Sequence, residues 1–260
     1  MSSPALRTHW VDALRGVAVV WMVAYHFCFD LSLLGFAHFA MLSDPWWTAQ
    51  RSAIVTLFML SAGVSQVLAW RAGQSVPAFW RRWAQIAGCS VGVSVATWWM
   101  FGPSWIYFGV LHAMAVSWLI TRFGLMRGVS LPMVLVAAVA LLSSAWWVPA
   151  GLAGSAFSGW GSGVQTVLNS PLGSVLGWVS LKPVTEDYVP LAPWLGVLWL
   201  GVAWGLWLQT KAAVVAQSVE PNLPRSPQWL RWLGRHSLLV YMVHQPVLLG
   251  GLQLLQALQR

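Results

Sequence analysis

The fold is decided by the first long apolar stretch of the chain, residues 11–31, which reads VDALRGVAVVWMVAYHFCFDL. Its length is close to the roughly 20 residues that an α-helix needs to cross about 30 Å of hydrocarbon. The stretch carries Asp12, His26 and Asp30 and lacks a small-residue cleavage site, which distinguishes it from a secretory signal peptide. We therefore predict a retained transmembrane helix.

The composition of the whole chain points the same way. Charged residues make up 8% of the 260 residues, whereas a soluble domain has about 25%. Apolar residues make up 58%, and the 21 Trp suit a chain with many boundaries between lipid and water. This composition excludes a soluble globular enzyme, a disordered chain and a coiled coil. The net charge of +8 is dispersed between apolar runs, so we interpret it as a topology signal rather than a nucleic-acid surface.

Further apolar runs follow the first one, each near the length of a span. They cover residues 50–70, 82–101, 104–121, 130–149, 190–209 and 236–256. We predict an all-α fold, a polytopic transmembrane bundle of about seven spans that forms a single domain over residues 1–260. A longer loop at 151–189 is rich in Gly and Ser, and its stretch 164–179 is apolar enough for an interfacial helix or an eighth span.

The basic residues give the predicted bundle an orientation. If seven spans alternate, one side receives Arg7, Arg71, Arg81, Arg82, Arg122, Arg127, Lys211, Arg225, Arg231 and Arg235. The other side receives Arg51, Lys182 and Arg260. Because cytoplasmic loops of membrane proteins carry an excess of Lys and Arg, we place the N-terminus in the cytoplasm.

The small residues and the two cysteines indicate how the predicted helices pack against one another. Residues 88–92 and 201–205 are both GxxxG, a motif that lets membrane helices approach closely, within the bundle or in a homodimer. Cys28 and Cys89 fall near opposite faces on this topology and lack metal-type spacing. We predict neither a disulfide nor a metal site.

One edge of the first predicted helix carries Asp12, Arg15, His26 and Asp30. At about 100° per residue the four positions fit within an arc of about 60°, over a rise of roughly 27 Å. Ionisable groups cost at least about 2.5–3.5 kcal/mol near the bilayer centre, so we expect this edge to face the protein interior. Asp30, one turn after His26, could orient its imidazole as a general base requires. Asp12 and Arg15 could alternatively pair only with each other.

Other polar residues in the apolar runs could join His26. His112 lies within 104–121, while Ser237, Tyr241 and His244 share one face of 236–256. On the other side, Glu186, Asp187 and Tyr188 precede the run at 190–209 and could hold a cationic or hydroxylated acceptor. For each of these residues the alternative is a structural role, a hydrogen bond within the bundle or a solvated loop.

These segments together resemble a known family. The motifs are Asp12-Ala13-Leu14-Arg15-Gly16 with Met22, His26-Phe27-Cys28-Phe29-Asp30-Leu31, Phe108-Gly109-Val110-Leu111-His112, Asp187-Tyr188-Val189-Pro190 with Pro193-Trp194-Leu195-Gly196, and Leu233-Gly234-Arg235-His236-Ser237 continuing to His244-Gln245-Pro246. They are similar to those of the transmembrane acyltransferases, in the bacterial branch grouped with the heparan-α-glucosaminide N-acetyltransferase catalytic domain. The last motif also resembles the related acyltransferase-3 group.

The resemblance implies an enzyme of the bacterial inner membrane. It would take an acetyl group from cytoplasmic acetyl-CoA and deliver it to the amine or hydroxyl of a sugar or glycan on the other side. His26, oriented by Asp30, would be the general base or a transient acyl carrier, and His112 or His244 would donate to the oxyanion of the intermediate. We assign Asp12, Arg15, Arg81 and Arg82 to the donor, and Asp187, Tyr188 and His244 to the acceptor.

A second class of protein remains compatible with the ionisable edge. A small proton-coupled secondary transporter would use such residues as a proton relay. The chain lacks an inverted repeat and lacks a pair of Gly/Pro-broken spans at matching positions, which favours the enzyme.

Overall fold

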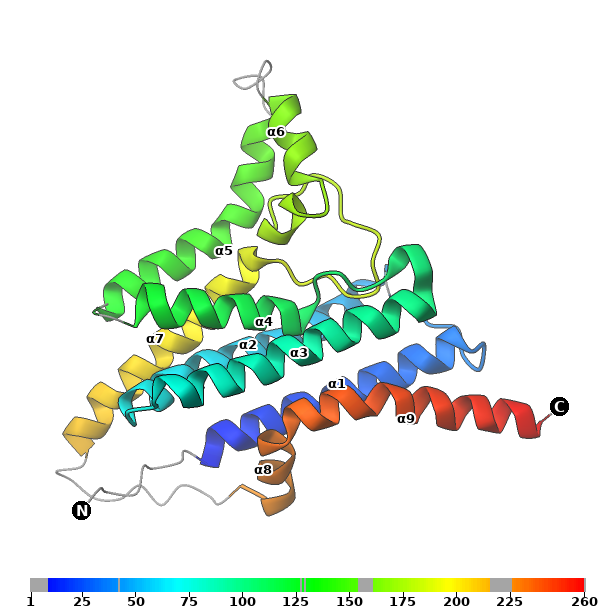
Figure 1. The fold of residues 1–260 in the computed structure, drawn as a ribbon, viewed down its shortest axis with the longest axis horizontal. Helices are drawn as coiled ribbons and strands as arrows, with labels where there is room; N and C mark the ends of the chain where they lie inside the picture. Colours follow the sequence, from blue (N-terminus) through cyan, green and yellow to red (C-terminus); the bar gives the residue numbers. More distant parts are fainter. Residues whose placement is uncertain are drawn as a thin grey trace. The chain divides into compact units, whose positions relative to one another are not determined.

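The computed structural model describes residues 9–41, 43–126, 128, 130–153, 161–215 and 226–259. The α-helices are α1 (His9–Leu33), α2 (Pro45–Arg71), α3 (Val76–Phe101), α4 (Val110–Leu119), α5 (Leu131–Ala153), α6 (Gly161–Leu168), α7 (Leu191–Val215), α8 (Gln228–Arg235) and α9 (Ser237–Leu258) (Figure 1). Shorter turns are η1 (Gly102–Ser104), η2 (Ile120–Leu125) and η4 (Gly173–Leu176). The all-α prediction is confirmed. Arg7, Arg127, Arg225 and Arg260, which entered the orientation prediction, lie outside the described residues.

Each predicted span overlaps a helix. Within the described residues, α1, α2, α5, α7 and α9 are long and apolar enough to cross a membrane. The other two predicted spans fall on α3, which has 26 residues and carries Arg81 and Arg82, and on α4, which has 10. Crossing by α3 and α4, like the cytoplasmic N-terminus, stays a prediction.

Of the two alternatives given for residues 164–179, an eighth span is not observed. The stretch 164–179 divides between α6, of 8 residues, and η4, of 4 residues. The break follows from Pro171, which cannot continue a helix, and from the turn at Asn169-Ser170 that precedes it. Helices of this length are far shorter than the roughly 20 residues that a span requires.

The chain forms two compact units. The first comprises residues 1–61 and 220–260, and the second comprises residues 62–219. The helix α2 begins in the first unit and ends in the second. The prediction of one domain stays a prediction, and each unit is described by itself below.

In the first unit, α1 contacts α9 along its length and α8 near its N-terminal end (Figure 1). Glycines allow the close contact with α8. A Cβ atom on Gly16 would collide with the backbone carbonyl of Leu230, and a Cβ atom on Gly234 would collide with that of Asp12. The two backbones therefore touch, as small residues permit between helices.

Replacing Gly234 by alanine is expected to destabilise the first unit. The added methyl group must displace the carbonyl of Asp12, and overpacking of this kind costs about 1–3 kcal/mol. Thermal unfolding of the purified protein in detergent should show a lower midpoint. Gly250→Ala in α9 is the matched control, because nothing lies within contact distance of a Cβ atom there. Equal midpoints for the two variants would contradict this account of the α1–α8 contact.

In the second unit, α5 packs along α7 and α3 packs against α4. Gly196 of α7 lies against the carbonyl of Ala138 in α5, and Gly63 of α2 lies against the carbonyl of Leu198 in α7. Of the two GxxxG motifs, the second packs inside the unit, since Gly205 faces Val67. The first does not pack at Gly88, around which the space is open.

Candidate active site

A pair of histidines joins α1 to α9 in the first unit. The Nδ1 atom of His26 lies 3.1 Å from the Nε2 atom of His244, and the ring centroids are 4.8 Å apart. On its other side, the Nδ1 atom of His244 lies 2.7 Å from the carbonyl oxygen of Tyr241 and 3.2 Å from that of Val240. His244 is 8% exposed, so this contact is shielded from solvent.

These contacts assign the protons of the neutral pair. A carbonyl oxygen only accepts, so the Nδ1 atom of His244 must carry its proton, and Nε2 presents a lone pair. The Nδ1 atom of His26 then donates to that lone pair. The remaining nitrogen of His26, Nε2, keeps an unshared lone pair and is the basic atom of the pair.

Asp30 is fully buried and accepts a hydrogen bond through Oδ1 from the Nε2 atom of Gln245, at 2.9 Å. Within the described residues, its Oδ2 atom and the Oε1 atom of Gln245 have no hydrogen-bond partner. The expectation that Asp30 orients His26 therefore needs correction, because the observed partner of His26 is His244. The reason is the packing of α9 along α1, which places the consecutive residues His244 and Gln245 against positions one turn apart on α1.

Asp12 and Arg15, which the sequence analysis expects to bind the donor, lie at the junction of α1 and α8. Asp12 forms ion pairs with Arg235 at 3.3 Å and with Arg15 at 3.8 Å. An Nη1 atom of Arg15 also lies 3.4 Å from the carbonyl oxygen of Gly234, to which it donates. The side chains of Asp12 and Arg15 are about four-fifths buried. Two of the residues predicted to bind the donor therefore hold α1 and α8 together.

His112 lies in the second unit, where it caps α4. Its Nδ1 atom accepts a hydrogen bond from the backbone N–H of Gly109 at 3.3 Å, so the proton sits on Nε2. That nitrogen donates to the Oγ atom of Ser94 at 3.0 Å, and the hydroxyl of Ser94 donates to the carbonyl of Ile106. Both ring nitrogens are engaged, an arrangement that favours a positioning role for His112.

Asp187 also serves the start of α4. Its Oδ2 atom accepts from the backbone N–H of Val110 at 2.9 Å. A carboxylate at this place satisfies a free N–H group and interacts favourably with the helix dipole. These two caps explain why α4 begins at Val110 rather than at residue 104, where the apolar run begins.

Tyr188 belongs to the same structure in the second unit. Its hydroxyl donates to the carbonyl of Ser174 at 2.6 Å, and the hydroxyl of Tyr107 lies 2.7 Å from the Oγ atom of Ser174. Burial, and then the neighbouring Tyr107, raise the pKa of Tyr188 well above its ordinary value, so its hydroxyl stays protonated and donates. An isolated β-bridge pairs Tyr188 with Phe108.

Arg81 and Arg82 lie near the N-terminal end of α3, in the second unit. Arg81 is exposed, and an Nη1 atom of Arg82 donates to the Oε1 atom of Gln85 at 3.0 Å. Of the predicted site residues, the structure joins His26 to His244 and Asp12 to Arg15, and it gathers His112 and Asp187 at the start of α4. Gln245 and Arg235 also join these contacts; neither is predicted as a site residue, although the motifs quoted above contain both.

Span-length apolar helices and a shielded histidine pair define an integral membrane protein with a potential acid–base centre. The comparison with protein families is more specific. Residues 7–246 match the family described as heparan-alpha-glucosaminide N-acetyltransferase, catalytic, and the chain belongs to this family. It is therefore an acetyltransferase, which confirms the prediction of an enzyme rather than a carrier. No match is found among curated proteins or among solved structures.

Proposed function

We propose that the protein transfers the acetyl group of cytoplasmic acetyl-CoA to a sugar or glycan amine or hydroxyl on the other side of a bacterial inner membrane. The observation that supports a role for His26 is its contact with His244 at 3.1 Å. That contact leaves the Nε2 atom of His26 as the basic atom. Membership of the acetyltransferase family supports the class of reaction.

In the direct route, His26 acts as a general base. The acceptor nitrogen or oxygen bonds to the carbonyl carbon of the thioester, and its proton moves to the Nε2 atom of His26. When the carbon–sulfur bond breaks, the thiolate of CoA leaves and takes this proton. His244 keeps the correct nitrogen of His26 free and is a positioning residue.

In the relay route, the Nε2 atom of His26 itself attacks the thioester. The CoA thiolate leaves, and the acetylated imidazole then passes its acetyl group to the acceptor, whose proton is released to the displaced imidazole. Both routes use the same lone pair. They differ in whether the protein carries label when acetyl-CoA is supplied without an acceptor.

Further roles follow from the charges and contacts. We propose that Arg15, Arg81 and Arg82 contact the phosphates of the donor, and that Asp12 holds Arg15 and Arg235 at the end of α1. For His112, Asp187 and Tyr188 we propose support of the loop before α7 and the start of α4, because their polar atoms are engaged there. This support would shape the acceptor side.

The function is tested with purified protein in sealed lipid vesicles. Acetyl-CoA labelled in the acetyl group is added outside, and a panel of amino sugars and neutral sugars is enclosed inside. We expect labelled sugar to form in the lumen, in proportion to the protein whose cytoplasmic side faces out. Product formed only when donor and acceptor share one compartment would overturn transfer across the membrane, and failure of CoA to bind in calorimetry would overturn the choice of donor.

A further inference from the structure

A buried group of hydrogen-bond donors in the second unit has no role in the proposed reaction. It lies where η2 follows α4. Arg122 is 9% exposed, and its guanidinium carbon lies 4.2 Å from the ring centroid of Trp70 and 5.2 Å from that of Phe79. One Nη2 atom of Arg122 donates to the carbonyl of Gln74 at 3.1 Å. The arginine is thus held by two aromatic rings and a backbone carbonyl.

In the described part of the chain, two neighbouring side chains carry polar atoms without a hydrogen-bond partner. Gln66 is 9% exposed, and within the described residues neither its Nε2 nor its Oε1 atom has a hydrogen-bond partner. The same holds for the Nε1 atom of Trp118. Gln66, Trp118 and Arg122 line one small cavity of about 30 Å³, large enough for one small polar group. Leaving such groups unpaired is costly, so the cavity is suited to a polar ligand atom.

The backbone directs these side chains to one place. The turn η2 is a π-helix, in which the N–H of Met126 donates to the carbonyl of Thr121 at 3.1 Å. Wide turns of this kind often occur at functional sites. Trp118, Arg122 and Met126 follow one another at four-residue intervals, and all three line the small cavity.

Within the described residues of the second unit, the charge of Arg122 is not matched by a nearby carboxylate. The acidic residues of the second unit are Glu186 and Asp187. Asp187 is bonded to Val110 at the opposite end of α4, and twelve residues of helix separate Val110 from Arg122, roughly 18 Å. A buried cation without a carboxylate favours an anionic ligand.

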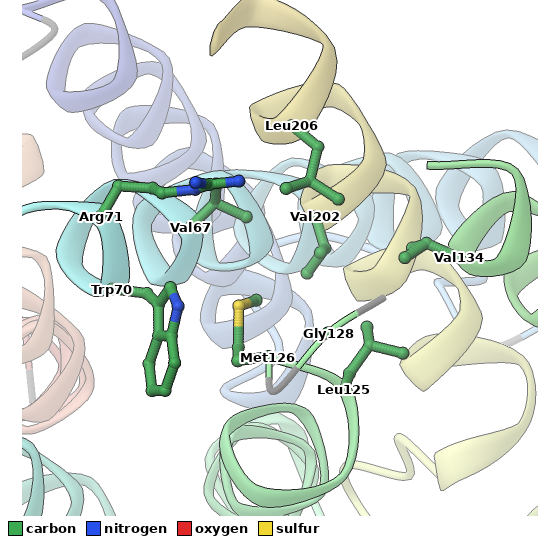
Figure 2. Close-up of a pocket in the computed structure, with 9 residues that line it drawn as sticks. All are labelled: Val67, Trp70, Arg71, Leu125, Met126, Gly128, Val134, Val202 and Leu206. Carbon is green, nitrogen blue, oxygen red and sulfur yellow. The ribbon is translucent and has the colours of Figure 1, made fainter. Parts of the chain in front are cut away.

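A larger pocket of about 650 Å³ adjoins the small cavity through Met126, which lines both. Figure 2 shows its lining side chains, contributed by α2, η2 and the segment after it, α5 and α7. Most of them are apolar, with Trp70 offering an aromatic face and Arg71 a second cation. The larger pocket therefore suits the apolar or aromatic part of a ligand that also carries a phosphate.

We propose that Arg122, Gln66 and Trp118 bind a phosphate oxygen whose parent molecule occupies the larger pocket beside Trp70 and Arg71. Two sources supply this chemistry, the nucleotide part of CoA and the headgroup of an anionic phospholipid. The first source rests on the proposed function, and the second does not.

The test compares Gln66→Leu with wild type in the absence of any acceptor. Calorimetry measures the binding of CoA and, separately, of short-chain phosphatidylglycerol, and thermal unfolding is measured without either ligand. We expect the variant to be at least as stable as wild type, because an unpaired buried amide is removed. We expect its affinity for one of the two ligands to fall at least about tenfold.

The two binding measurements distinguish the nucleotide of CoA from a lipid headgroup. Weakened CoA binding identifies the nucleotide, and weakened phosphatidylglycerol binding identifies the lipid. Gln165→Leu in α6 is the matched control and should leave both affinities unchanged. If Gln66→Leu does not fold, Trp118→Phe provides the same readouts, since it keeps the ring and removes the N–H. Wild-type affinity for both ligands in the folded variant would overturn the proposal, whether or not acetyl transfer occurs.

Discussion

Replacing His26 by alanine is expected to lower the kcat of acetyl transfer by at least about 100-fold, because positioned acid–base groups contribute about 10²–10⁴-fold. The side chain supplies the free Nε2 lone pair that either route requires. Binding of CoA should persist, since His26 holds no charge that the donor phosphates need. The measurement is labelled product from acetyl-CoA at saturating acceptor, alongside calorimetry with CoA.

His38→Ala is the matched control for this experiment. His38 lies in the loop after α1, outside the contacts of the histidine pair, and its loss should leave kcat unchanged. Rapid quenching of wild type with labelled acetyl-CoA and no acceptor separates the routes, because only the relay leaves label on the protein. Undiminished turnover by His26→Ala would remove this histidine from the mechanism.

The helical periodicity of residues 11–31 predicted a good part of this site. Asp12, Arg15 and Asp30 are buried or largely buried within the first unit, as one inward-facing edge requires. Period alone, however, shows only which residues share a face of one helix. It contains no information on which other helix covers that face, and so the sequence favours the neighbouring Asp30 as the partner of His26.

The quoted motifs meet in pairs that lie far apart in the sequence. Asp12 and Gly16 meet residues 230–235, and His26 and Asp30 meet His244 and Gln245. In the second unit, residues 108–112 meet 187–189. The pairs are of recognisable types, such as an ion pair, an imidazole lone pair with an N–H group, or a carboxylate at a helix start. Which residues pair, however, depends on tertiary contacts.

The start of α4 shows why local apolarity misled the prediction of a boundary. Residues 105–107 are apolar and aromatic, and hydropathy alone extends a helix through them. The backbone groups of these residues instead form hydrogen bonds with side chains from other segments. The carbonyl of Trp105 accepts from the hydroxyl of Thr185 at 2.8 Å, and the N–H of Ile106 donates to the Oγ1 atom of Thr97 at 3.0 Å. Such distant partners leave no trace in the local pattern.

Replacing His244 by leucine is expected to lower kcat by about 10- to 100-fold, with a smaller change in the KM for acetyl-CoA. His26 would lose the lone pair of His244 as an acceptor in a shielded place and keep its hydrogen bond to the backbone of Met22, and the loss of a buried hydrogen bond costs about 1 kcal/mol. The imidazole of His26 would then be free to carry its proton on either nitrogen, and the fraction with a basic Nε2 would fall.

The variant His244→Gln separates the effect of His244 on the orientation of His26 from its effect on the packing of α9 against α1. Its amide oxygen has roughly the reach of the Nε2 atom of histidine and can accept from His26, whereas leucine fills similar space without accepting. Measured together, kcat and the unfolding midpoint should show His244→Gln recovering most of the rate that His244→Leu loses, even where the two midpoints agree. Equal rates in the two variants would mean that His244 only packs α9 against α1, and the free lone pair of His26 would then need another cause.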